Sequence, residues 1–121
     1  MKKNTLILGA SPNPERYAHK ATLMLSEKGH HVFPIGLRAG KIGDHNILTD
    51  TPLIKNVNTI TLYVGPKNQP TYYDYIINTI KPKRIIFNPG TENDELLNLA
   101  QENGIETEVA CTLVLLSIGN Y

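Results

Sequence analysis

The chain has 121 residues, of which 40% are hydrophobic and 19% are charged, and these proportions predict one soluble globular domain spanning residues 1–121. Twelve Lys and Arg against eleven Asp and Glu leave a formal net charge of +1, which excludes general binding to nucleic acid or to an anionic membrane. The single cysteine, Cys111, excludes an internal disulfide. No apolar run is long enough for a signal peptide or a membrane span, so we expect a cytoplasmic protein.

Short apolar runs rich in branched residues alternate with amphipathic stretches, and Gly or Pro separates most of them. In chain order they first predict a strand at residues 5–8, a turn at 11–14, a helix from about residue 15 or 17 to a left-handed cap at Gly29, and a strand at 31–35. A glycine-spaced loop at 36–43 and irregular chain at 44–56 follow, and then a strand at 59–64, a turn at 65–70 and a helix at 71–80. The last part predicts a strand at 84–87, a turn at 88–90, a helix capped by Thr91 and Asp94 and ended by Gly104, a strand at 105–109 and a helix at 112–118.

Strands that alternate with helices through short connections imply right-handed crossovers. We therefore predict a small doubly wound α/β fold, with a mostly parallel sheet and helices on both of its faces. Ligands of such sheets bind beyond the carboxyl ends of the strands. Five segments should line that edge: residues 9–11, 36–43, 65–67, 88–90 and 110–112.

The first of these segments keeps only part of a dinucleotide-binding glycine motif. Gly9 is present, but Ser11 and a proline stand where the later glycines belong. Free amides near a helix start attract phosphate, and Arg16 and Lys20 would add positive charge on one helix face. The alternative interpretation is that Gly9 only makes a tight turn and that both cations are solvated.

The loop after the second strand distinguishes between cofactors. An NAD enzyme uses a carboxylate there to bind the ribose hydroxyls, and none occurs between Val32 and Gly43. Arg38 and Lys41 are present instead. These cations suit a phosphorylated ribose, as in NADP or coenzyme A.

Several motifs together resemble the small coenzyme A-binding domain family. They are residues 8–16 (LGASPNPER), 25–29 (LSEKG), 31–35 (HVFPI), 88–93 (NPGTEN) and 103–105 (NGI), with Cys111. This family is similar to the N-terminal domain of the succinyl-CoA synthetase α subunit, so the resemblance implies a stand-alone Rossmann-like protein, with an NAD(P)-binding type of fold, that binds CoA. The chain departs from the family at Gly36, where many members have Asn, at residues 65–67, and at Asn88, where Gln is common.

The resemblance also implies which residues form the nucleotide site. Gly9, Ala10, Ser11 and Arg16 would contact the ADP phosphates. Two turns would border the cofactor, through Gly65, Pro66, Asn88, Pro89 and Gly90.

No catalytic or metal-binding group accompanies these motifs. The four histidines form no ligand pair at helical spacing, and surface or turn positions are expected for them. Cys111 has no partner histidine in evident reach, which favours a buried structural cysteine. Tyr72, Tyr73 and Tyr75 are explained by packing, with adenine stacking as the alternative.

The sequence thus favours non-catalytic binding of coenzyme A or an acyl-CoA. Two other hypotheses stay open: a subunit of an NADP-linked reductase, and a regulatory or interaction protein that has lost the ligand. A reductase of this size would need a partner protein or a homodimer interface to hold its substrate.

Overall fold

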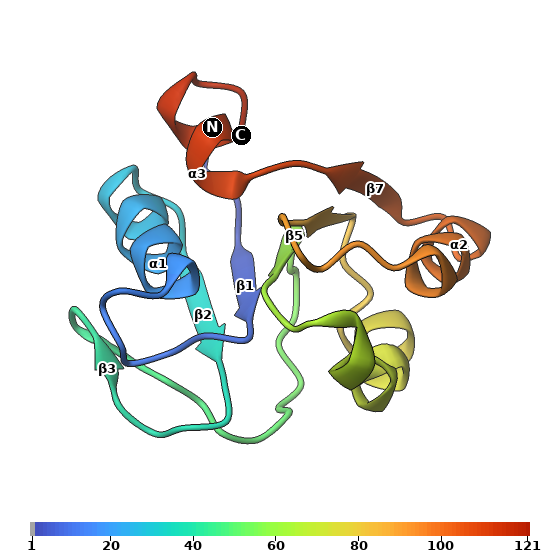
Figure 1. The fold of residues 1–121 in the computed structure, drawn as a ribbon, viewed down its shortest axis with the longest axis horizontal. Helices are drawn as coiled ribbons and strands as arrows, with labels where there is room; N and C mark the ends of the chain where they lie inside the picture. The colour runs from blue at the N-terminus through green and yellow to red at the C-terminus, as the bar shows by residue number, and fades with distance from the viewer. Residues whose placement is uncertain (1) are drawn as a thin grey trace.

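The structure, a computed structural model, describes residues 2–121 and has a five-stranded parallel sheet at its centre (Figure 1). The strands are β1 (Thr5–Leu8), β2 (Val32–Ile35), β5 (Thr59–Leu62), β6 (Arg84–Phe87) and β7 (Glu106–Val109). Their order is β2-β1-β5-β6-β7, and every neighbouring pair is parallel. The predicted α/β fold is confirmed, and the strand order reverses between β1 and β5.

Helical segments cover both faces of this sheet, as predicted (Figure 1). They are α1 (Tyr17–Glu27), η1 (Pro66–Asn68), η2 (Pro70–Tyr72), η3 (Tyr75–Ile80), α2 (Asp94–Glu102) and α3 (Thr112–Ser117). On one face, Ile7 of β1 packs in a cluster with Leu25 of α1 and Leu116 of α3. On the other face, Leu6 and Leu8 belong to a cluster with η3 and α2. The alternation of side chains along β1 therefore supplies two cores, which explains why all four of its residues are buried.

The segment predicted as a helix at residues 71–80 is irregular. A 3₁₀ turn begins at Pro70, and Tyr75–Ile80 then forms a π-helix in which the Lys81 N–H bonds to the Ile76 oxygen at 3.0 Å. Tyr75, Ile76, Ile77 and Ile80 are all buried against the sheet. The amphipathic pattern identified the buried helical segment but did not reveal its wider turn.

Two other local predictions need correction. The loop and irregular region include a small antiparallel pair, β3 (Lys41–Ile42) with β4 (His45–Asn46), whose two-residue strands are too short to show an alternating pattern. Helix α2 is capped by Asn93, whose Oδ1 accepts from the Glu95 N–H at 3.0 Å, and not by Thr91. Thr91 is buried and donates its hydroxyl to the Asn88 oxygen. Within residues 2–121, no helix has the length and apolar character needed to cross a lipid bilayer.

Candidate functional site

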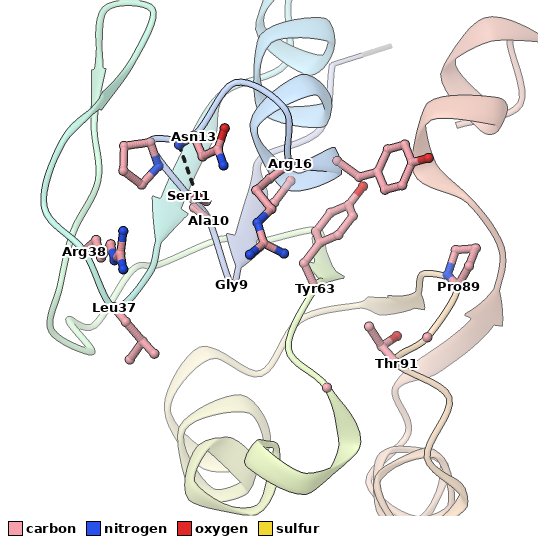
Figure 2. Close-up of a pocket in the computed structure, with 15 residues that line it drawn as sticks. Gly9, Ala10, Ser11, Asn13, Arg16, Leu37, Arg38, Tyr63, Pro89 and Thr91 are labelled. Carbon is pink, nitrogen blue, oxygen red and sulfur yellow. Dashed lines mark hydrogen bonds between the residues drawn. The ribbon is translucent and has the colours of Figure 1, made fainter.

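A cavity of about 560 Å³ opens at the carboxyl ends of β1, β5 and β6, beside the point where the strand order reverses (Figure 2). This is the edge at which doubly wound sheets bind their ligands. Most of the residues predicted from the sequence line it: Gly9, Ala10, Ser11, Arg16, Arg38, Gly65, Pro89 and Gly90.

The loop after β1 is held in place by hydrogen bonds on both sides. The amides of Gly9 and Ala10 both donate to the Ile35 oxygen, at 2.9 and 2.8 Å. His19 Nδ1 lies 2.9 Å from the Ser11 oxygen, and the Ser11 hydroxyl accepts from the Asn13 N–H (Figure 2). The Gly9 and Ala10 amides are therefore used inside the protein. The Ser11 amide has no partner within residues 2–121, so it can donate to an anion.

Two glycines fix the shape of this loop. Gly9 has φ of +99°, and a side chain there would press on the Tyr63 main chain, with its Cβ 2.9 Å from the carbonyl carbon. At Gly36, a Cβ would overlap the Ala10 carbonyl oxygen. The loops after β1 and β2 thus touch through their main chains. A side chain at Gly36 would therefore require these two loops to move apart.

Arg16 and Arg38 bring positive charge to the cavity from two different elements. Arg16 precedes α1, Arg38 follows β2, and both side chains are exposed at the cavity wall (Figure 2). Neither has an acidic partner in the described chain, where the ion pair is Arg84 with Glu108. No Asp or Glu is among the described residues that line the cavity. The cavity therefore favours an anionic ligand.

Four predicted site residues do not line the cavity. Lys20, Lys41 and Pro66 are exposed outside its lining. Asn88 is buried beneath it, where its amide donates to Thr61 Oγ1 and to the Leu62 oxygen, and its Oδ1 accepts from the Thr112 N–H, all within 2.8–2.9 Å. Asn88 thus joins β5, β6 and α3.

The sequence did not reveal Gln69, which has no exposed surface. Its Nε2 donates to the Val64 oxygen at 2.9 Å and to the Thr91 oxygen at 2.8 Å, and its Oε1 accepts from Asn93. Gln69 therefore ties the loop after β5 to the loop after β6. Its partners are distant in the chain, so no local pattern identified it.

Apolar and aromatic side chains complete the cavity. Leu37 is 90% exposed and Tyr17 is 68% exposed at its edge. Tyr63 lies deeper, and burial raises the pKa of its phenol to about 12. Its buried hydroxyl makes no hydrogen bond of normal geometry in the described structure, although the Thr61 and Thr112 side chains lie close enough to act on its pKa. Leu37 belongs to the segment at residues 36–43 that was predicted to line this edge, although nothing in the sequence singled it out within that segment.

The remaining candidates from the sequence lie elsewhere. His19 is buried beneath the first loop, which corrects the expected surface or turn position, and Cys111 is half-buried, not buried. Tyr75 donates its hydroxyl to the Pro52 oxygen and Tyr73 donates to Glu95, so both take part in internal contacts. No group of three His, Cys, Asp or Glu side chains in residues 2–121 could hold a metal ion.

Comparison with known proteins agrees with this fold. A crystal structure described as that of an uncharacterized protein shares 48% identity and a TM-score of 0.96, over 100% of this chain and 99% of the other. A hypothetical protein from Pyrococcus horikoshii shares 27% identity over 93% of this chain and 80% of its own, with a TM-score of 0.82. A Thermus thermophilus protein at 20% identity has the same fold, with a TM-score of 0.85 over 99% of this chain and 91% of the other.

Family relationships are more informative than these structural neighbours. No curated protein matches the chain. The family model described as CoA binding domain matches residues 3–117, which include every strand and helix of the fold. The chain therefore belongs to the CoA binding domain family.

Proposed function

We propose that this protein binds coenzyme A or an acyl-CoA in the cavity at the carboxyl ends of β1, β5 and β6, without catalysing a reaction on it. The observation that carries the proposal is the pair Arg16 and Arg38 on a cavity with no lining carboxylate. The family match over residues 3–117 supports the ligand class and supports treating the chain as one binding domain.

The two arginines are suited to different phosphates of the nucleotide. Arg16 and the unpaired Ser11 amide lie on the same loop segment and would hold the pyrophosphate. Arg38 follows β2, where a ribose is bound in doubly wound folds, and would hold the 3′-phosphate. Lys20 and Lys41 lie outside the lining, and we propose that they add only to the surrounding positive potential.

Gly65 gives independent support for an occupied cavity. Its φ of −63° and ψ of 154° suit any residue, and a Cβ there would meet nothing within 4 Å. Neither the backbone nor a neighbouring side chain therefore requires a glycine at this position. A ligand that passes close to the main chain would require one.

The absence of chemistry in the proposal follows from the side chains of the lining. The described residues that line the cavity include no His, Asp, Glu, Lys or Cys. The Ser11 and Thr91 hydroxyls and the Tyr17 and Tyr63 phenols are present, but the described lining offers no His, Lys or carboxylate base to activate them. The lining is thus equipped to bind and orient a nucleotide.

The test is thermal unfolding of the protein with coenzyme A, acetyl-CoA, NADP and NAD, each at saturating concentration. A ligand at 100 times its dissociation constant stabilises by about 2.7 kcal/mol, which for a domain of this size raises the Tm by about 10 °C. We expect this shift with the two CoA compounds, and we expect Gly65→Val to abolish it while leaving the Tm of the free protein unchanged. A larger shift with NADP would favour the reductase hypothesis. No shift with any ligand would favour an interaction protein.

A further inference from the structure

A second cavity, of about 380 Å³, lies at the opposite edge of the sheet. It is lined by the chain just before β1, β5 and β6, through residues 2–4, residues 56–58, Lys81 and Lys83. The same three strands therefore have one cavity at their carboxyl ends and another at their amino ends.

Hydrogen bonds join the three walls of this second cavity. The Asn58 N–H donates to the Asn4 oxygen at 2.8 Å, and the Lys83 N–H donates to the Asn58 oxygen at 3.0 Å. The Asn4 side chain donates to the Asn56 oxygen at 3.0 Å. These contacts extend the sheet into the walls, so the cavity has a fixed shape.

The lining is strongly basic. It contains four lysines and no carboxylate among the described residues. The Lys3 ammonium is directed away, to the Tyr121 main-chain oxygen, with Glu106 and Glu108 close enough to act on its charge. The Lys2 side chain lies against Gly29, where an added Cβ would be 3.4 Å from its Nζ. Lys81 and Lys83 have no acidic partner in residues 2–121, so their charges are available to a ligand.

The backbone at this cavity is strained at two places. Asn56 has φ of 63° and Lys81 has φ of 53°, and these are the non-glycine residues with positive φ in residues 2–121. Lys81 caps the C-terminal end of η3, a position that glycine usually occupies because it has no Cβ to clash. A lysine at this position is less favourable for folding than a glycine. Such strained residues cluster at binding sites.

We infer that this second cavity binds a small anion that carries phosphate groups. Lysine ammonium groups act as point charges on a phosphate, which exposes oxygens in several directions and carries more negative charge than a carboxylate. The cavity volume lies within the range of small-ligand sites. The inference does not rest on the proposed function, since the two cavities share no lining residue.

The test is titration of the ¹⁵N-labelled protein with pyrophosphate at constant ionic strength, followed by amide chemical shifts. We expect saturable shifts at residues 56–58 and at Lys81 and Lys83. Lys81→Gly should weaken pyrophosphate binding about tenfold, the lower limit for the loss of one charge-assisted contact, and should raise the Tm by relieving the left-handed backbone. Lys83→Ala should weaken binding by a similar factor.

Lys55→Ala is the matched control, because Lys55 is exposed beside Asn56 but does not line the cavity. It should leave the affinity nearly unchanged. An equal loss in this control would mean that pyrophosphate responds only to diffuse charge, and the inference would be wrong. Shifts confined to residues 9–11 and Gly65 would place pyrophosphate in the first cavity alone and would also overturn it. A protein that binds pyrophosphate at residues 56–58 but fails to bind coenzyme A would refute the proposed function and keep the second site.

Discussion

Arg16 and Arg38 approach the first cavity from separate elements, so each should act on a different phosphate. Arg16 is exposed, and an exposed arginine of this kind adds little to folding stability. Arg16→Ala should therefore weaken coenzyme A binding about tenfold to a hundredfold, since charge-assisted hydrogen bonds contribute about 1.5–3 kcal/mol. Calorimetric titration and melting curves measure both effects. Lys20→Ala, four residues along the same face, is the control and should change affinity much less.

Arg38 should distinguish coenzyme A from dephospho-coenzyme A, because only the former has a 3′-phosphate. Arg38→Ala is expected to weaken coenzyme A binding about tenfold and to leave dephospho-coenzyme A nearly unaffected. Lys41→Ala serves as the comparison, as Lys41 lies in β3 outside the cavity lining. Equal losses for both ligands in the Arg38 variant would show that this arginine does not contact the 3′-phosphate.

The hydroxyl of Tyr63 should cost stability because it is buried without a hydrogen bond of normal geometry. Tyr63→Phe removes it and should raise the free energy of unfolding by about 1 kcal/mol at pH 7. The pKa of Tyr63 is raised to about 12 in the folded protein, above the ordinary value of 10. The stability linked to this phenol is therefore complete below about pH 10 and is lost as the pH rises toward 12. Urea unfolding at pH 7 and pH 11 should show a smaller alkaline loss in the variant.

Tyr75→Phe provides the contrasting control for that measurement. Burial also raises the pKa of Tyr75 to about 12, but its hydroxyl donates to the Pro52 oxygen at 2.7 Å. Removing this hydroxyl should destabilise the protein at pH 7. A gain in stability from both variants would mean that neither hydroxyl is satisfied, contrary to the structure.

Helix α2 depends on the side chain of Asn93. Its Oδ1 caps the helix, and its Nδ2 donates at 2.8 Å to Gln69 and to the Tyr73 hydroxyl. Asn93→Ala should lower the free energy of unfolding by about 1–2 kcal/mol, and Asn98→Ala, on the exposed face of the same helix, should change it by only a few tenths. Asn93→Asp keeps the cap but loses both donated bonds, so the free energy of unfolding of this variant should lie between the values of Asn93→Ala and Asn98→Ala. Denaturant titration of the three variants decides this order.

The same elements show how far the sequence determines the fold. Residues 5–8 and 84–87 are predicted as strands with the observed bounds, because branched apolar runs that end at turns leave few other structures. The π-helix and the β3–β4 pair were missed, since their form depends on packing or covers too few residues for a period. Arg16 and Arg38 were identified from local charge. Gln69 could not be identified from the sequence, because its hydrogen bonds reach residues as distant as Thr91.

The parallel arrangement of the five strands concentrates polar contacts at the sheet edge that holds the first cavity. Five strands with one direction bring the loops after β1, β5 and β6 together. Beneath them, Asn88 binds Thr61 and the Thr112 amide, while the Thr61 and Thr112 hydroxyls lie 2.8 Å apart. Buried polar groups of this kind stabilise a structure only when each is paired, and here they pair with one another across the sheet.

The contacts of Gln69 and Asn88 have a consequence for the kinetics of association. The loops that border the first cavity are tied to each other through main-chain oxygens before any ligand arrives. A nucleotide would thus meet a surface that is already ordered, and little conformational entropy would be lost on binding. Encounter, guided by the two arginines, would then limit the association rate, and differences in affinity between acyl-CoA species would arise from their residence times.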